Sequence, residues 1–184
     1  MAINLQKGQR VAIGLQKLIV GLGWDPAESG EDFDLDATAC MLGSNKKLPA
    51  DEFFVFYNNQ KSPDGACGST GDDRTGGNSE DGDDEQILVD LTKVDQRINS
   101  IVFSASIHEA DKRRQNFGQV QNSYIRICDE RTGEELCKYE LCEDFSIETA
   151  IEFGRLYLHN GAWKFEATGI GHRGGLESIV NKYY

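Results

Sequence analysis

The apolar residues of this chain recur mostly with a period of two, the period of a β-strand with one buried face. The segment DFDLDATACML (32–42) alternates most clearly, because every odd position from Phe33 to Met41 is apolar, whereas Asp34, Asp36 and Thr38 lie between them. This pattern predicts a strand whose apolar face packs in a core. Asp34 and Asp36 would project together from the opposite face.

Other short runs, rich in β-branched or aromatic residues and bounded by turn residues, predict further strands. They are EFFVFY (52–57), QILVDL (86–91), SIVFSASI (100–107) and the two halves of SYIRICDERTGEELCKYEL (123–141) around Thr132–Gly133. The strongest hairpin signal is GRLYLHNGAWKFEATG (154–169), because Asn160–Gly161 suits a type I′ turn. Trp163, Phe165 and Ala167 alternate behind that turn.

Helical patterns are scarce. Leu91, Val94 and Ile98 have helical spacing, 109–118 is a charged loop or short helix, and LESIVNKYY (176–184) predicts a terminal helix. Seven to nine short strands separated by turns predict an all-β fold, a β-sandwich of two antiparallel sheets with a few short helices. We expect residues 1–184 to form a single domain in which 58–85 is one long loop.

That loop holds an unusual concentration of negative charge. Between Asp72 and Glu85 it contains seven carboxylates and one arginine, a net charge of −6, which is half of the −12 carried by all 184 residues. Two like charges about 6 Å apart in water repel by about 0.7 kcal/mol. The charge alone fits both a solvated acidic tract and a cation-binding loop.

The residue types favour calcium among the possible cations. The loop has no His or Cys, and its glycines at 71, 76, 77 and 82 allow the backbone to turn its carbonyl groups inward. Calcium takes six to eight oxygen ligands in flexible geometry, whereas magnesium prefers a rigid octahedron and zinc prefers nitrogen and sulfur. Asp34 and Asp36 would supply rigid anchors for such a site, and Asp25 and Asp32 are candidate additional ligands.

The remaining composition argues for a cytoplasmic protein. The longest uncharged run near the N-terminus, Leu18 to Trp24, is too short for a signal-peptide core or a membrane span. The five cysteines lack C-x-x-C spacing, which argues against a zinc ribbon and a disulfide scaffold. The acidic surplus disfavours nucleic acid as a partner, and no stable membrane insertion is expected.

Several motifs, in order over nearly the whole chain, resemble the TerD family of tellurium-resistance and bacterial stress proteins. They are GLGWD (21–25), DFDLDA (32–37), FYNNQKSPDG (56–65), TGDDRTG (70–76), GDDE (82–85), NFGQV (116–120), NSYIR (122–126) and WKFEATGIG (163–171). The resemblance implies a non-catalytic β-sandwich that binds calcium, with two ions expected, at clustered acidic loops. Other stress or tellurium-resistance proteins are its possible partners.

The resemblance also implies a set of metal ligands. From the strand it implies Asp34 and Asp36, and from the loop Asp72, Asp83, Asp84 and Glu85, with Asp25 and Asn58 nearby. This chain has Asp72–Asp73 where the family usually has Asp-Asn, and its GNSED segment (77–81) is longer than the family's usual spacing. Asp73, Glu80 and Asp81 are therefore additional candidates.

Three rival functions use the same residues differently. A metal-dependent phosphoester hydrolase would need a general base or phosphate-binding cations, and the basic run KRR (112–114) is interpreted as a solvated face. Thiol chemistry would use Cys128, Cys137 and Cys142, with Cys128 on the more polar face of its strand. A calcium-dependent membrane or protein docking module would need basic and apolar loop tips, but the loop offers only Arg74.

Overall fold

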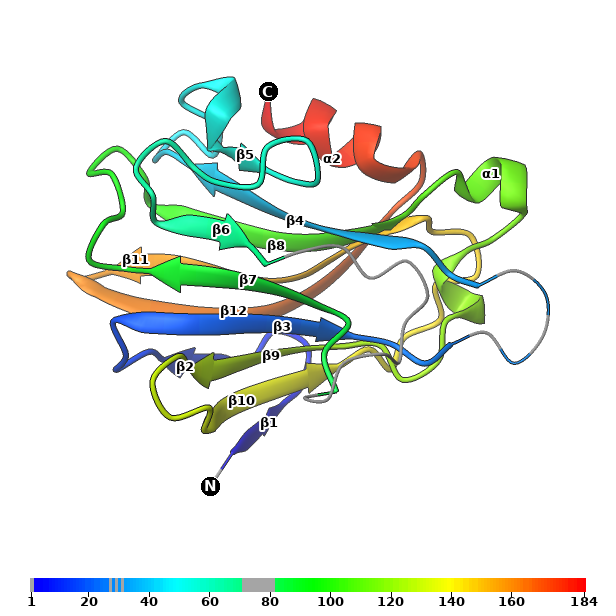
Figure 1. Cartoon of the computed structure of the whole chain (residues 1–184), viewed down its shortest axis with the longest axis horizontal. Helices are drawn as coiled ribbons and strands as arrows, with labels where there is room; N and C mark the ends of the chain where they lie inside the picture. Colours follow the sequence, from blue (N-terminus) through cyan, green and yellow to red (C-terminus); the bar gives the residue numbers. More distant parts are fainter. Residues whose placement is uncertain (1, 27, 29, 31, 71–81) are drawn as a thin grey trace.

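The computed structural model describes residues 2–26, 28, 30, 32–70 and 82–184, which contain two six-stranded sheets packed face to face (Figure 1). Sheet A has the order β1 (Ile3–Leu5), β10 (Glu135–Glu140), β9 (Tyr124–Asp129), β3 (Lys17–Gly23), β7 (Glu85–Asp90) and β6 (Cys67–Ser69). Sheet B has the order β2 (Arg10–Ala12), β12 (Ala162–His172), β11 (Ala150–His159), β8 (Ser100–Ile107), β4 (Leu35–Leu42) and β5 (Phe54–Val55). The predicted β-sandwich is confirmed.

Neighbouring strands run antiparallel, apart from β1, which pairs in parallel with β10. The main core lies between the sheets and takes Leu18, Val20 and Leu22 from sheet A. From sheet B it takes, among others, Phe103 and Phe165. These residues alternate along their strands, so the period-two pattern of the sequence is the pattern of inward-facing side chains.

Strand β4, which contains most of the DFDLDATACML segment, is buried on both faces. All eight residues of β4 are buried, including Thr38, Cys40 and Leu42 on the face predicted to be polar. A terminal helix, α2 (Gly175–Tyr183), covers that face, and its Ile179 and Tyr183 pack on Cys40 and Leu42. The expectation of one open strand face is therefore wrong, because a helix distant in sequence supplies a second apolar layer.

The hairpin predictions are correct. In the β11–β12 hairpin, Asn160 and Gly161 have φ values of 51° and 76°, and His159 pairs with Ala162 across them. Two positive φ values are what a type I′ turn requires. Gly133, in the turn between β9 and β10, also has a positive φ of 72°.

Three local predictions are wrong. Residues 91–98 form turns with no helix, and the 52–57 run is divided between a 3₁₀ helix, η1 (Asp51–Phe53), and the two-residue β5. The stretch 58–85 is not one uninterrupted loop, because β6 lies within it and pairs with β7. The strands also number twelve in the described residues, more than the seven to nine expected.

The other helices are short. Within the expected 109–118 segment, α1 (Ala110–Arg113) is followed by a 3₁₀ helix, η2 (Phe117–Gln119), and both lie near one end of the sandwich (Figure 1). The predicted terminal helix is confirmed as α2. Among the described residues, no helix has the length and apolar character needed to cross a membrane.

Candidate metal centre

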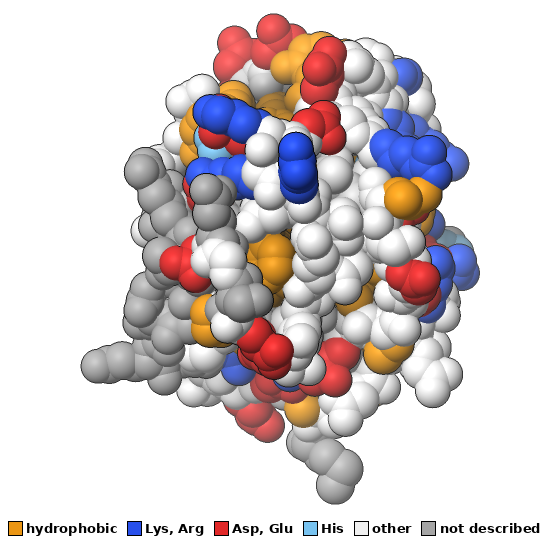
Figure 2. Space-filling view, turned by 90° about the vertical axis from the view of Figure 1, so that its right-hand side faces the viewer, with side chains coloured by type: hydrophobic (Ala, Val, Ile, Leu, Met, Phe, Trp, Pro, Cys, Tyr) orange, Lys and Arg blue, Asp and Glu red, His pale blue; other side chains and the backbone are white. Residues whose placement is uncertain are grey.

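Acidic residues from both sheets gather at the end of the sandwich where β3 ends and β4 and β7 begin (Figure 1). Figure 2 looks onto this end, where acidic side chains lie among basic side chains and a histidine. Four carboxylates here are almost completely buried, with exposed fractions of 8% for Asp36, 2% for Asp83, 9% for Asp84 and 6% for Glu85. Buried carboxylates are costly unless donors or cations compensate them.

Glu85 connects the two sheets. It is the first residue of β7 in sheet A, yet its Oε2 accepts a hydrogen bond of 2.6 Å from the backbone N–H of Ala37 in β4 of sheet B. Because Ala37 follows Asp36 directly, this bond holds the Glu85 carboxylate near the start of β4. The DFDLDA strand and the GDDE segment therefore meet at Glu85, whereas the convergence of the Asp34 and Asp36 side chains on a shared ion stays a prediction.

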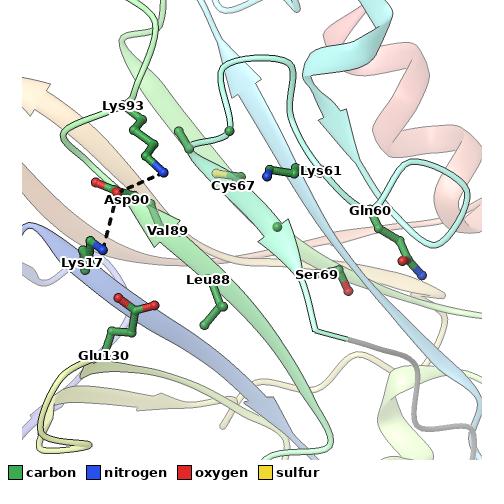
Figure 3. Close-up of a pocket in the computed structure, with 13 residues that line it drawn as sticks. Lys17, Gln60, Lys61, Cys67, Ser69, Leu88, Val89, Asp90, Lys93 and Glu130 are labelled. Carbon is green, nitrogen blue, oxygen red and sulfur yellow. Dashed lines mark ion pairs between the residues drawn. The ribbon is translucent and has the colours of Figure 1, made fainter.

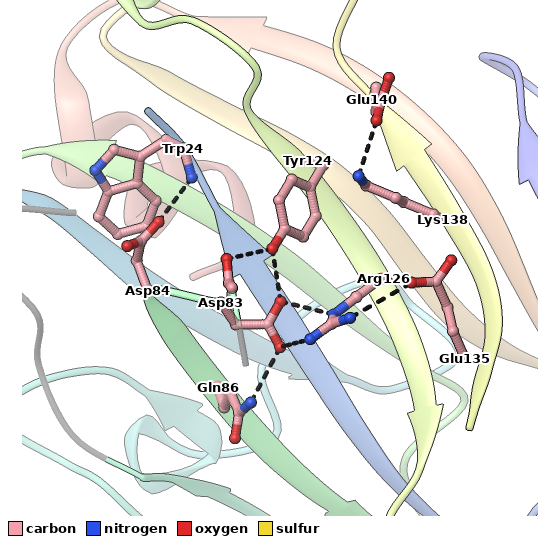
Figure 4. A network of polar contacts seen from close by, with 10 residues as sticks. Trp24, Asp83, Asp84, Gln86, Tyr124, Arg126, Glu135, Lys138 and Glu140 are labelled. Carbon is pink, nitrogen blue, oxygen red and sulfur yellow. Dashed lines mark hydrogen bonds and ion pairs between the residues drawn. The ribbon is translucent and has the colours of Figure 1, made fainter. Parts of the chain in front are cut away.

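Asp84 is held against the end of β3. Its Oδ2 accepts a hydrogen bond of 2.8 Å from the backbone N–H of Trp24, and its own N–H donates to the Leu22 carbonyl at 2.8 Å. The indole ring of Trp24 is buried beside it (Figure 4). Asp84 and Glu85 thus enter the end of the sandwich from neighbouring positions, each fixed by a main-chain donor.

Asp34 and Asp36 each lie beside a basic side chain from the segment after β8. Asp36 Oδ2 is 3.7 Å from His108 Nδ1, and Asp34 Oδ2 is 3.7 Å from Arg113 Nη2. The Arg113 side chain is only 25% exposed. The interpretation of KRR as a solvated face is therefore wrong for Arg113, which the α1 turn directs toward Asp34.

Asp83 belongs to a separate polar network on the outer face of sheet A (Figure 4). Its Oδ1 accepts hydrogen bonds from Arg126 Nε at 2.7 Å and from the Tyr124 hydroxyl at 2.9 Å. Its Oδ2 accepts from Arg126 Nη2 and Gln86 Nε2, both at 3.0 Å. Although burial opposes the charge on Arg126, its hydrogen bond to Asp83 raises the pKa of the guanidinium. Burial and the Asp83 charge raise the pKa of the Tyr124 hydroxyl, which stays protonated.

Two glycines of the GLGW segment make room for this network. A Cβ atom on Gly21 would overlap the Asp83 carboxylate, and one on Gly23 would overlap the Tyr124 ring. Sequence reasoning missed Tyr124, Arg126 and both glycines as parts of the site. The available signal was the i, i+2 spacing of Gly21 and Gly23, which leaves one face of a strand bare for a side chain from elsewhere.

The other predicted ligands are less central or lie outside the described residues. Asp25 is exposed, and its Oδ2 accepts from Asn122 Nδ2 at 2.5 Å. Asn58 is exposed in the turn between Phe56 and Asn59. The candidates outside the description are Asp72, Asp73, Glu80 and Asp81. In the described part of the chain, no three His, Cys, Asp or Glu side chains are arranged to hold a metal by themselves.

A concave region lies far from these acids, on the outer face of sheet A beside β6 (Figure 3). It encloses about 450 Å³ and is lined by Lys17, Lys61 and Lys93 around Asp90. The Asp90 carboxylate lies 4.0 Å from Lys17 Nζ and 3.7 Å from Lys93 Nζ, and hydrogen bonds from Thr92 lower its pKa. Cys67 in this wall is fully buried, and burial raises the pKa of its thiol, so it is not an activated nucleophile.

The cysteines give little support to thiol chemistry. All five are free, and only Cys142 is exposed. Cys128 lies on the same face of β9 as Tyr124 and Arg126, as predicted, but the expected exposure of its thiol is wrong, because the side chain is buried and desolvation raises its pKa. A raised pKa lowers the thiolate fraction, which is the reactive form.

The comparisons with known proteins agree with the motifs. The family model described as the TerD domain matches residues 1–183. The chain belongs to the TerD family. This TerD chain is 46% identical over 189 residues to tellurium resistance protein TerD of Alcaligenes sp., covering 100% of this chain and 97% of the relative.

Two further comparisons extend the likeness. The TerD chain is 47% identical over 190 residues to general stress protein 16U of Bacillus subtilis, again covering 100% of this chain and 97% of the relative. A solved structure from Streptomyces coelicolor, described as a homologue of telluride resistance protein (TerD), superposes with a TM-score of 0.70. It is 22% identical, covers 91% of this chain and 96% of its own, and supports the fold alone.

Proposed function

We propose that this TerD-family protein is a calcium-binding, non-catalytic stress-response protein associated with tellurium resistance. It binds two calcium ions at the acidic end of the sandwich. The observation that carries the proposal is the Glu85–Ala37 hydrogen bond, which joins the GDDE segment of sheet A to the DFDLDA strand of sheet B. The names of the relatives support the physiological association.

The chemistry of the donor set suits calcium. Asp34, Asp36, Asp84 and Glu85 offer carboxylate oxygens, which are the ligands of hard cations such as calcium. Bound calcium would offset the mutual repulsion of these carboxylates and their loss of hydration. In addition, the Trp24 indole N–H is buried and has no hydrogen-bond acceptor among the described residues. A water in a cation's hydration shell is an acceptor of the kind that this N–H needs.

A structural or signalling role agrees with the charges better than hydrolysis does. Two arginines in the described residues lie beside these acids, Arg113 against Asp34 and Arg126 against Asp83, so neither presents an unshielded positive charge to a phosphate. We therefore expect no metal-dependent turnover of phosphoesters. The proposed location is the cytoplasm, where free calcium is scarce, and the site then needs a dissociation constant of about 10⁻⁷ to 10⁻⁵ M.

Calorimetric titration of chelator-treated protein tests the proposal. Wild type is expected to bind two calcium ions per chain in that range and to bind magnesium more weakly, because the ligands do not impose a rigid octahedron. The Asp34→Asn/Asp36→Asn variant is expected to lose at least one of the two sites.

The matched control is Asp51→Asn/Glu134→Gln, which removes two exposed carboxylates outside the site. It should bind calcium as wild type does. Absence of calcium uptake by wild type, or equal losses in both variants, would contradict the proposal. Turnover of a phosphoester panel that depends on added metal would favour a hydrolase instead.

A further inference from the structure

Asp83 is already saturated by protein donors, unlike a carboxylate awaiting a cation. A carboxylate has about four positions at which it accepts hydrogen bonds. Its two oxygens have four donor atoms between 2.7 and 3.0 Å away, namely Nε and Nη2 of Arg126, Gln86 Nε2 and the Tyr124 hydroxyl (Figure 4). A cation would have to displace a bidentate arginine, which is among the strongest partners that a carboxylate has.

The surroundings of Asp83 are shaped for this arrangement. Gly21 leaves the space that its carboxylate fills, and Gly23 leaves the space for the Tyr124 ring. Lys138 Nζ lies 4.1 Å from the centre of that ring on its far side, and Glu135 Oε2 lies 3.5 Å from Arg126 Nη1. Strands β3, β9 and β10 therefore all contribute to holding one side chain of the GDDE segment.

The backbone next to Asp83 leads directly to the acids of the proposed metal centre. The Tyr124 hydroxyl lies 2.5 Å from the Gly82 carbonyl oxygen and shares its one proton between that oxygen and Asp83. The Asp84 N–H donates to the Leu22 carbonyl at 2.8 Å. The next two side chains, Asp84 and Glu85, accept from the N–H groups of Trp24 and Ala37. Fixing Asp83 thus fixes the direction from which Asp84 and Glu85 enter the end of the sandwich.

We propose that Asp83 is a positioning residue and not a calcium ligand, and that Arg126 is its counter-charge. Together they anchor the start of β7 so that Asp84 and Glu85 face the metal centre. This inference rests on the proposed calcium function and changes the ligand set that the family resemblance implied. Removing a residue that orients a metal ligand without touching the metal typically lowers metal affinity by about 10- to 100-fold.

The two roles of Asp83 predict opposite effects of Arg126→Gln. If Asp83 is a positioning residue, the variant binds calcium about 10- to 100-fold more weakly than wild type. If Asp83 is a ligand, removal of a competing positive charge leaves calcium affinity unchanged or raises it, and the inference is overturned. Arg126→Lys is expected to give an intermediate affinity, because lysine keeps the charge and loses the two-pronged geometry.

Hydrogen exchange in metal-free protein provides the readout that does not depend on calcium. The amides of Trp24 and Ala37 report whether Asp84 and Glu85 are in place, and both are expected to exchange faster in Arg126→Gln. Unchanged exchange at both amides would overturn the inference. If wild type takes up no calcium, the proposed function fails, and this exchange comparison still decides the role of Asp83.

Two more variants keep the test interpretable. Arg155→Gln removes a comparable arginine–carboxylate pair, 2.7 Å from Arg155 Nη2 to Glu166 Oε2 on sheet B, and should change neither calcium affinity nor exchange at Trp24 and Ala37. If Arg126→Gln does not fold, Tyr124→Phe removes one donor only and should shift both readouts in the same direction by less. No shift in either readout for Tyr124→Phe would then count against the inference.

Discussion

Replacing Gly21 with alanine is expected to lower the free energy of unfolding by about 3–5 kcal/mol, because the added methyl group takes the space of the buried Asp83 carboxylate. Asp83 is 2% exposed and would have to leave Arg126, which breaks a largely buried ion pair. Overpacking alone costs about 1–3 kcal/mol, so separation of the charges is the larger part. Denaturant unfolding with an unchanged m-value measures the loss.

Gly14→Ala is the matched control. A Cβ atom on Gly14 would meet nothing within 4 Å, so this variant should stay within about 0.5 kcal/mol of wild type. Equal stability of the Gly21 and Gly14 variants would show that Asp83 can move without cost. It would also remove the structural reason for the paired glycines in GLGW.

The second large effect is expected at Glu152, a buried acid on the outer side of sheet B beneath α2. Its Oε1 lies 2.7 Å from Lys182 Nζ and 2.8 Å from His172 Nε2, and its Oε2 accepts from the Tyr183 hydroxyl at 2.8 Å. Glu152→Gln is expected to lower the free energy of unfolding by about 2–3 kcal/mol, because hydrogen bonds to a charged acceptor are replaced by weaker neutral ones. The 39% exposure of Lys182 keeps the loss below that of a fully buried pair.

Acid should remove the same stabilisation. Burial alone would raise the pKa of Glu152, but hydrogen bonds from His172 and Lys182 outweigh it and lower that pKa below its usual value of 4.5. A lowered pKa in the folded state means that the stabilisation is complete above about pH 4.5 and is lost as the pH falls through the folded-state pKa. When the pH is lowered from neutral to below about 4.5, wild type should therefore lose more stability than Glu152→Gln.

The exposed Glu177 of α2 supplies the comparison. Unfolding curves of Glu177→Gln should follow those of wild type both at neutral pH and below about pH 4.5, since the side chain is exposed. An acid sensitivity of Glu152→Gln equal to that of wild type would contradict the assignment of this pH dependence to Glu152.

Much of the fold could be predicted because strand periodicity is a local signal. The 100–107 strand and the Asn160–Gly161 hairpin depend on neighbours in sequence, and both are correct. The helical spacing of Leu91, Val94 and Ile98 predicted a helix that does not form, because side-chain acceptors stabilise turns in this segment instead. Asp90 Oδ1 accepts from the Thr92 N–H, and Asp95 Oδ1 from the Arg97 N–H, so local acceptors compete with a helix.

The candidate site was predictable only in part. Alternation placed Asp34 and Asp36 on one face, but it gave no sign that α2 covers that face. Likewise, the adjacent acids of GDDE have different partners. Asp83 contacts Arg126, 43 residues away, whereas Glu85 contacts Ala37, 48 residues away. Such pairings arise from the packing of whole sheets, and no spacing rule within the segment carries them.

Terbium luminescence tests the central claim, a calcium site beside Trp24, most directly. The chain has two tryptophans, Trp24 beside Asp84 and Trp163 next to the distant β11–β12 turn, so each can sensitise only an ion near itself. We predict that terbium emission excited through tryptophan persists in Trp163→Phe, is largely lost in Trp24→Phe, and is displaced by calcium in wild type. Emission that survives in Trp24→Phe, or that calcium does not displace, would contradict a calcium site at this end of the sandwich.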